Sequence, residues 1–365
     1  MNRYALLNRN TAIRGLALSN RIVFPPFVTG YSSNDGMVTD RQVKFYKEIA
    51  AGGPGLVIVG ATAVSPDGTG WMGNTRIDND NAISGLKNLF DAIKAEGAAA
   101  GIQLYHCGVS TNTERTGGRP LVAPSAVPYP DGSGTAVALT REDIDILEEA
   151  FAGSAERAFE AGADLVEIHC AHGYLIDQFL SPLSNRRTDE YGGSLENRAR
   201  FALNIIEKTR RAVGPDNIVG VRIGADEFAE GGYGLDESGI FSRWMAQKGA
   251  DFIHVSGGMN QKGLEAMNKG VFVQMAAEIK KGVDVPVICV GNIKNLARAE
   301  EIIASGAADL VAMGRALVAD PGLIRKSFSG NEDQIVDCVD CLECILSIGN
   351  DSGNGMTCCQ NPNLP

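Results

Sequence analysis

Residues 163–174 read Ala163-Asp-Leu-Val-Glu-Ile-His169-Cys-Ala-His172-Gly-Tyr174, and this stretch decides the architecture that we expect. Its first half has the apolar character of a buried parallel strand. Two imidazoles and a phenol follow directly, and the carboxyl ends of strands are where a (β/α)8 barrel keeps its chemistry. Imidazole N–H groups can hold a substrate oxygen that becomes negative, while a tyrosine supplies a proton. We therefore predict catalytic roles for His169, His172 and Tyr174.

Other apolar runs of strand length recur along the chain, and amphipathic stretches of helix length lie between them. The expected strands are residues 21–25, 56–60, 100–104, 165–169, 218–223, 252–256, 287–290 and 310–313. The expected helices are residues 41–51, 83–96, 141–161, 195–213, 237–248, 271–281 and 296–305. Eight strand–helix units predict an α/β protein, a (β/α)8 TIM barrel. The alternative is an open doubly wound sheet, which uses the same local units. No Gly-x-Gly-x-x-Gly motif leads from a strand into a helix, so no Rossmann-type nucleotide domain is indicated.

The composition is that of an ordinary soluble enzyme: 365 residues, 44% hydrophobic and 21% charged. A formal net charge of -11 argues against a nucleic-acid partner. No apolar run approaches the roughly 18 residues that a membrane span needs, and the N-terminus lacks the apolar core of a signal peptide. We expect a cytoplasmic protein that acts on a small molecule and has no membrane partner, and a homo-oligomer is compatible with the sequence.

Small residues end the last two expected strands, in Cys289-Val-Gly291-Asn292 and Ala312-Met-Gly314-Arg315. Backbone N–H groups can approach an anion closely there, and the loops after strands seven and eight are the usual phosphate site of this barrel. We predict that Gly291, Asn292, Gly314 and Arg315 hold a phosphate group. The alternative is that the glycines serve only tight turns.

Gln103 and Arg222 are polar residues near the ends of two other expected strands. A glutamine amide both donates and accepts, which suits the edge of an isoalloxazine ring. An arginine can offset the negative charge of a reduced flavin. The alternative for Arg222 is an ion pair with Asp226 or Glu227.

The chain resembles the Old Yellow Enzyme family of FMN-dependent ene reductases over residues 2–330. The motifs that carry this resemblance are Leu18-Ser-Asn-Arg21, Gly101-Ile-Gln103-Leu, Ala123-Pro-Ser-Ala, His169 to Gly193 with Glu196-Asn-Arg198, Val221-Arg222 and Met313-Gly314-Arg315. The resemblance implies noncovalent FMN at the carboxyl ends of the strands. It also implies that NAD(P)H reduces the flavin, which then passes a hydride to an alkene activated by a carbonyl group.

The same resemblance implies roles for individual residues. His169 and His172 would hold the carbonyl oxygen of the unsaturated substrate, and Tyr174 would give a proton to its α carbon. The alternative is a packed histidine pair beside a buried tyrosine. The flavin ring would contact residues after the first two strands: Pro25, Pro26, Val28 and Ala61. Val28 stands where relatives often have Thr or Cys, and it cannot donate a hydrogen bond to the flavin.

Five of the eight cysteines lie near the C-terminus. Cys338, Cys341 and Cys344 have C-x2-C-x2-C spacing, and Cys358 follows after thirteen residues. Without a secretion signal, such clustering favours metal binding over disulfides. We predict a [4Fe-4S] cluster on these four cysteines, with zinc or free thiols as alternatives.

The tail resembles that of the dienoyl-CoA reductase and trimethylamine dehydrogenase branch, in which a [4Fe-4S] site follows the barrel. Two features differ from that branch. These 365 residues do not include the reductase domain that comes next there, and only two residues separate the second and third cysteines, where that branch has three. We therefore divide the chain into an FMN-binding barrel, residues 1–334, and a cysteine-rich tail, residues 335–365.

Ene reduction, with NAD(P)H or an electron-transfer protein as the electron donor, is the leading interpretation. The same flavin site would also suit oxidative demethylation or double-bond isomerisation. A third interpretation is an electron-transfer subunit of a larger complex.

Overall fold

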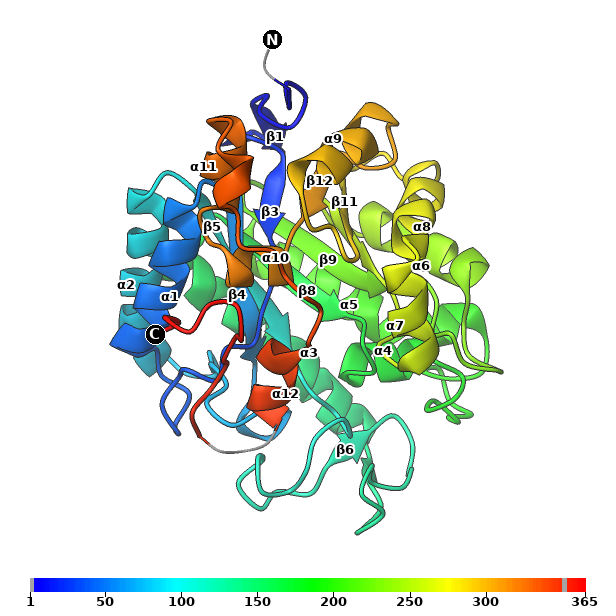
Figure 1. Cartoon of the computed structure of the whole chain (residues 1–365). Coiled ribbons are helices and arrows are strands. Elements are labelled where there is room, and N and C mark those ends of the chain that lie inside the picture. The colour runs from blue at the N-terminus through cyan, green and yellow to red at the C-terminus, as the bar shows by residue number, and fades with distance from the viewer. Residues whose placement is uncertain (1–2, 350–352) are drawn as a thin grey trace.

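The computed structural model describes residues 3–349 and 353–365. Parallel strands close into a barrel in the order β10-β11-β12-β3-β4-β5-β8-β9 (Figure 1). The barrel strands are β3 Ile22–Phe24, β4 Leu56–Ala63, β5 Ala99–Tyr105, β8 Leu165–Cys170, β9 Ile218–Gly224, β10 Ile253–Ser256, β11 Val287–Val290 and β12 Leu310–Ala312. The predicted (β/α)8 barrel is confirmed, and the closed strand order excludes the open sheet.

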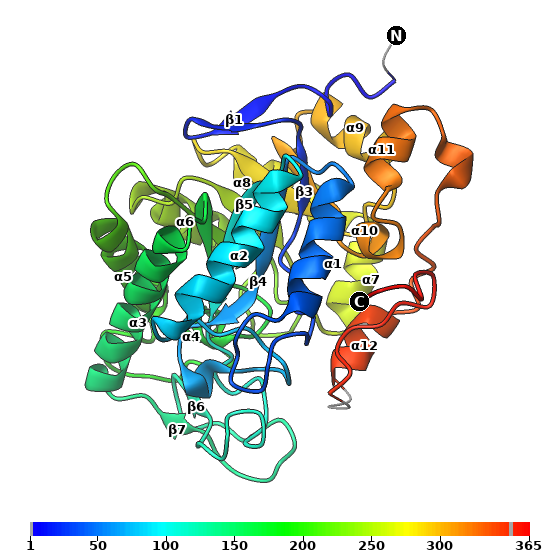
Figure 2. The same cartoon turned by 90° about the vertical axis from the view of Figure 1, so that its left-hand side faces the viewer.

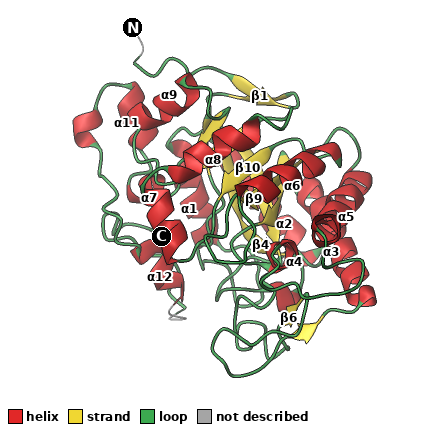
Figure 3. Ribbon diagram, turned by 90° about the vertical axis from the view of Figure 1, so that its right-hand side faces the viewer, coloured by secondary structure: helices red, strands yellow, loops and turns green. Residues whose placement is uncertain are grey.

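Helices surround the barrel on its outer side, and the C-terminal helix lies at the carboxyl ends of the strands (Figures 1 and 3). They are α1 Asp40–Ala51, α2 Asn81–Ala95, α3 Arg141–Glu160, α4 Leu175–Leu180, α5 Leu195–Val213, α6 Leu235–Gln247, α7 Gln261–Asn268, α8 Val271–Lys280, α9 Leu296–Ala304, α10 Arg315–Ala319, α11 Leu323–Phe328 and α12 Glu343–Gly349. Side-chain caps explain several starts, including a capping box in which Thr140 and Asp143 bond each other's backbone N–H groups. The described helices include none long and apolar enough to cross a membrane.

The remaining elements are short. A hairpin of β1 Thr11–Ile13 and β2 Leu16–Leu18 lies at the end of the barrel opposite α12 (Figure 1). Strands β6 Val122–Ala123 and β7 Val137–Ala138 pair in a long loop after β5, and Pro66–Gly68 and Glu332–Gln334 form 3-10 turns (Figure 2).

Alternate residues of each strand point into the barrel, and the polarity of this interior changes along its length. The end near the β1–β2 hairpin is apolar and includes Leu165, Ile218 and Phe252. Gly220 makes room for Phe252, because a Cβ at this position would lie 2.1 Å from its ring. The strands' carboxyl ends instead carry buried polar side chains, among them Gln103. These buried polar side chains form the bottom of the space at the carboxyl ends of the strands, which we call the polar floor. The apolar side chains pack beneath it.

The C-terminal tail packs onto the barrel. The Tyr31 hydroxyl donates to the Met356 carbonyl over 2.5 Å, and the Asn361 amide donates to the Val318 carbonyl over 3.0 Å. Cys344 and Met356 belong to the same buried cluster as the barrel's outer face. The C-terminus itself lies beside α1 (Figures 1 and 2), where Arg41 donates to the Pro365 carbonyl. The tail is thus fixed to the barrel's surface near the strands' carboxyl ends.

Candidate active site

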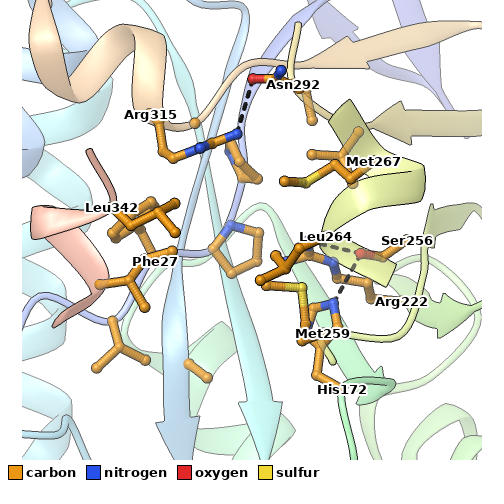
Figure 4. A pocket seen from close by; sticks show the side chains of 18 of the residues that line it. Phe27, His172, Arg222, Ser256, Met259, Leu264, Met267, Asn292, Arg315 and Leu342 are labelled. Atoms are coloured by element: carbon orange, nitrogen blue, oxygen red, sulfur yellow. Dashed lines mark hydrogen bonds between the residues drawn. The ribbon is translucent and has the colours of Figure 1, made fainter. Parts of the chain in front are cut away.

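A cavity of about 600 Å³ opens at the carboxyl ends of the barrel strands (Figure 4). It is lined by all but one of the predicted catalytic and cofactor-binding residues: Pro25, Pro26, Val28, Ala61, Gln103, His169, His172, Tyr174, Arg222, Asn292, Gly314 and Arg315. The exception is Gly291. Its φ of 139° and its close packing against Phe272 require a residue without a side chain, so it shapes the backbone after β11. Residues from strands far apart in the sequence therefore meet in one space.

The catalytic candidates leave β8 through a tight turn. His169 occupies an inward-facing position near the end of the strand, and His172 has a left-handed φ of 64°. The Gly173 N–H donates to Asp177 Oδ2 over 2.7 Å. Asp177 belongs to the following helix, α4, so this hydrogen bond joins the turn to the helix. The Tyr174 ring then packs edge-on against His169, with the ring centroids 5.1 Å apart. This turn brings all three side chains to the same wall of the cavity.

Hydrogen bonds indicate which ring nitrogen carries the proton in each of the two imidazoles. The Ala171 N–H donates to His169 Nδ1 over 3.2 Å, so the proton of a neutral His169 lies on Nε2. That nitrogen is 3.2 Å from His172 Nδ1, and His172 Nε2 is 2.8 Å from Ser256 Oγ. Burial holds the pKa of both histidines well below the ordinary 6.5; His172 lowers the pKa of His169 further, and the positive charge of Arg222 lowers the pKa of both. Both rings are therefore neutral N–H donors at physiological pH.

The Tyr174 hydroxyl accepts a hydrogen bond from Trp71 Nε1 over 3.2 Å. Burial raises the pKa of this phenol above its usual value of 10.0, and the bond from Trp71 lowers it by less. Tyr174 thus keeps its proton at neutral pH and can donate it.

Arg222 lies on the polar floor of the cavity. Its Nη2 is 3.5 Å from Ser256 Oγ, and its Nε is a buried donor without a partner among the described residues. Asp226 and Glu227, the alternative partners, instead accept bonds from Phe228 N–H and Ser181 respectively. A buried donor of this kind suits an acceptor supplied by a ligand.

Positive charge gathers at another side of the cavity. Arg315 Nη2 donates to Asn292 Oδ1 over 2.9 Å (Figure 4), and Arg315 also pairs with Asp340 of the tail over 3.0 Å. Lys294 pairs with the same carboxylate. Lys294 and Asp340 were not predicted from the sequence, although Lys294 follows the predicted Asn292 by two residues. Two cations and the backbone at Gly314 can together hold an anion.

The tail forms part of the cavity wall. Leu342, Ile345, Leu346 and Ile348, in or next to α12, face Met259, Leu264 and Met267 across the cavity. Figure 4 shows Leu342 and the methionines on opposite sides. This wall makes the mouth of the cavity largely apolar, and it was not predicted from the sequence.

The tail cysteines lie near one another but differ in environment. Cys344 is buried, and burial together with the neighbouring Cys358 raises the pKa of its thiol to about 12. Cys341 Sγ lies 3.1 Å from Cys359 Sγ, and Glu343 completes a group of ligand atoms within 4.8 Å of one another. Cys358 is the fourth ligand predicted from the sequence, whereas Cys359 lies next to Cys341 in the structure.

Comparison with known proteins identifies the family. The family model described as NADH:flavin oxidoreductase / NADH oxidase matches residues 11–334. The chain belongs to this family. The expected resemblance to Old Yellow Enzymes is confirmed, since the solved homologue from Zymomonas mobilis superimposes with a TM-score of 0.78. That match has 26% identity and covers 89% of this chain and 92% of the other.

Two curated members of the family are similar in sequence. The chain is 40% identical to a metal reductase of Desulforamulus reducens over 89% of its own length and 49% of the relative's. It is 42% identical to an NADPH dehydrogenase of Halalkalibacterium halodurans, over 85% of its own length and 90% of the relative's. The chain thus spans about half the length of the metal reductase.

The structure of 2-naphthoyl-CoA reductase in complex with 2-naphthoyl-CoA superimposes with a TM-score of 0.94 at 29% identity. It covers 99% of this chain, tail included, and 57% of the other. The chain is accordingly a member of a flavin oxidoreductase family with the Old Yellow Enzyme fold, and its tail has a counterpart in a longer relative.

Proposed function

We propose that the protein reduces a C=C bond conjugated to a carbonyl group, as in an enone, enoate or enoyl thioester, using FMN and electrons from NAD(P)H. The observation that carries this proposal is the wall formed by His169, His172 and Tyr174. It combines two neutral N–H donors with a protonated phenol, and all three line one cavity of about 600 Å³.

The cavity fits FMN in three respects. The unpartnered Nε of Arg222 would donate to the pyrimidine edge of the flavin, which carries acceptors. Arg315 and the backbone at Gly314 would hold the phosphate, with Lys294 adding positive charge. Apolar surface for the ring comes from Pro25, Pro26, Val28 and Ala61. Bound there, FMN would accept a hydride from NAD(P)H and give it to the β carbon of the alkene.

The two imidazoles would hold the substrate's carbonyl oxygen. Each ring carries one N–H, and neutral rings can donate without the cost of a buried charge. Negative charge grows on this oxygen as the β carbon is reduced, so the two hydrogen bonds strengthen in the transition state. Ser256, which contacts His172 Nε2, helps to orient the second ring.

Tyr174 would deliver the proton that the α carbon needs. Its hydroxyl is held by Trp71 Nε1 and its ring by contact with His169, so the proton is presented in a defined position. Loss of a positioned general acid usually costs a factor of about 100 to 10,000 in rate.

The cavity mouth favours an apolar substrate. Met259, Leu264 and Met267 lie on one side, and Leu342 and Ile345 of the tail lie on the other. Methionine side chains adapt to ligands of different shape. We therefore propose that the alkene carries a bulky hydrophobic group.

For the tail we propose a [4Fe-4S] cluster on Cys338, Cys341, Cys344 and Cys358, with zinc as the alternative. The supporting observation is proximity: the other three cysteines, Cys338, Cys341 and Cys358, all lie near enough to the buried Cys344 for their charges to act on its thiol. Cys338 also lines the cavity, so electrons from a partner protein would reach the flavin over a short path.

The test is anaerobic stopped-flow reoxidation of the reduced flavin. We expect 2-cyclohexenone or an enoyl thioester to reoxidise it, and cyclohexanone, which lacks the C=C bond, to leave it reduced. Reduced flavin that remains stable with every enone and enoyl thioester would contradict ene reduction. That outcome would favour demethylation, isomerisation or an electron-transfer role.

A further inference from the structure

A carboxylate lies buried inside the barrel below the cavity. Glu167 of β8 is fully buried and is not part of the cavity lining. Its Oε1 accepts from Gln103 Nε2 of β5 over 2.7 Å, and its Oε2 lies 2.8 Å from His254 Nδ1 of β10. The chemistry proposed above does not use this group. Burying a carboxylate is costly unless the charge is paired and hydrogen-bonded, so the partners of Glu167 account for its presence here.

Hydrogen bonding indicates that Glu167 is ionised. The buried positive charge of Arg222 lies close enough to interact with Glu167, and it favours the ionised carboxylate, in which neither oxygen carries a proton. His254 Nε2 has no partner among the described residues, and a buried N–H left unpaired there would be costly. The His254 proton therefore belongs on Nδ1, where it is donated to Oε2. Both carboxylate oxygens act as acceptors.

This carboxylate fixes the orientation of the Gln103 amide. If the amide were turned over, its oxygen would face a carboxylate oxygen, and two acceptors would oppose each other. Gln103 therefore turns its nitrogen to Glu167 and offers Oε1 to the cavity that it lines. The pyrimidine ring of an isoalloxazine carries one N–H, which Oε1 would accept.

Glu167 is also a counter-charge for Arg222. Both residues are buried and point inward from neighbouring strands, where β8 and β9 pair. Burial lowers the pKa of Arg222, and Glu167 is the first group that opposes this effect. Without the carboxylate, the guanidinium would have an uncompensated positive charge beneath the cavity. Reduced flavin is more negative than oxidised flavin, so this change would favour the reduced form.

We infer that Glu167 is a positioning residue for the flavin. It fixes the orientation of the Gln103 amide and balances the charge of Arg222. This inference rests on the FMN site of the proposed function, but not on the alkene reaction. The deciding variant is Glu167→Gln, which keeps the shape and removes the charge.

The midpoint potential of bound FMN, measured by anaerobic spectroelectrochemistry, is the first readout. We expect Glu167→Gln to favour reduced over oxidised FMN by about tenfold, which is a positive shift of about 30 mV for a two-electron couple. The matched variant Gln103→Leu keeps the charge and should shift the potential by less. Equal potentials for native protein and Glu167→Gln would overturn the inference.

FMN affinity, measured by fluorescence titration, is the second readout. Glu167→Gln should weaken binding through Gln103, so the double variant with Gln103→Leu should bind FMN as the single Gln103→Leu does. Fully additive losses would contradict action through Gln103. If Glu167→Gln does not fold, Glu167→Asp serves instead. This variant keeps the charge but is too short to hold the Gln103 amide, so it should weaken FMN binding while the midpoint potential changes little. Unchanged FMN binding would overturn the inference. Neither readout needs an alkene, so a failure of enone reduction is distinguishable from a failure of this inference.

Discussion

Replacing Tyr174 by Phe separates the two half-reactions of the proposed cycle. The change keeps the ring that packs on His169 at 5.1 Å and on Tyr105 at 5.0 Å. It removes the hydroxyl that accepts from Trp71 Nε1 at 3.2 Å, which should cost about 0.5–1.5 kcal/mol of stability. Without the proton donor, flavin reoxidation by a weakly activated alkene should slow by about 100- to 10,000-fold. That factor corresponds to about 3–5 kcal/mol in the activation barrier.

Flavin reduction by NAD(P)H needs no proton from Tyr174 and should remain nearly unchanged. Anaerobic stopped-flow absorbance measures each half-reaction separately. Tyr105→Phe is the matched control, because the Tyr105 hydroxyl bonds Asn74 and the Gly70 N–H and does not line the cavity. Equal slowing of both half-reactions in Tyr174→Phe, or no slowing of reoxidation, would refute the assignment of Tyr174 as the acid.

Further measurements address protonation, the tail and the barrel interior. Burial lowers the pKa of both active-site histidines well below 6.5, so they stay neutral above that pH. The rate of flavin reoxidation should therefore be constant from about pH 6.5 to 8. A change of rate that follows a titration within this range would contradict neutral imidazoles. Cys358→Ser should reduce anaerobically purified iron well below four per chain while Cys359→Ser retains it, and the reverse result would exchange their roles. Gly220→Ala should lower the free energy of unfolding by about 1–3 kcal/mol or more because its Cβ would collide with Phe252. Gly239→Ala, in open space on α6, should be neutral or stabilising by up to about 1 kcal/mol, so equal losses in denaturant unfolding would argue against the packing explanation.

The barrel was predictable from sequence because its signals are local. Each strand is a short apolar run, and polar residues such as Gln103 and Arg222 stand out at the point where a run ends. The short helices α4, α7, α10, α11 and α12 were missed, since five to eight residues give too little periodicity to recognise.

Contacts between distant segments were not predictable in the same way. Glu167 was read as one residue of a strand, because its partners Gln103 and His254 meet it only when the barrel closes. The pairing of Asp340 with Arg315 depends on the path of the tail, as does the proximity of Cys359 to Cys341. Spacing alone identified the thiols, but it did not reveal that their segment forms a wall of the cavity.

The most direct test of the account is an anaerobic titration of the folded protein with FMN and, in parallel, with riboflavin. We predict one FMN bound per chain and much weaker binding of riboflavin, which lacks the phosphate that Arg315 and Gly314 would hold. Folded protein that remains colourless and binds neither compound would contradict the central claim that this cavity is a flavin site.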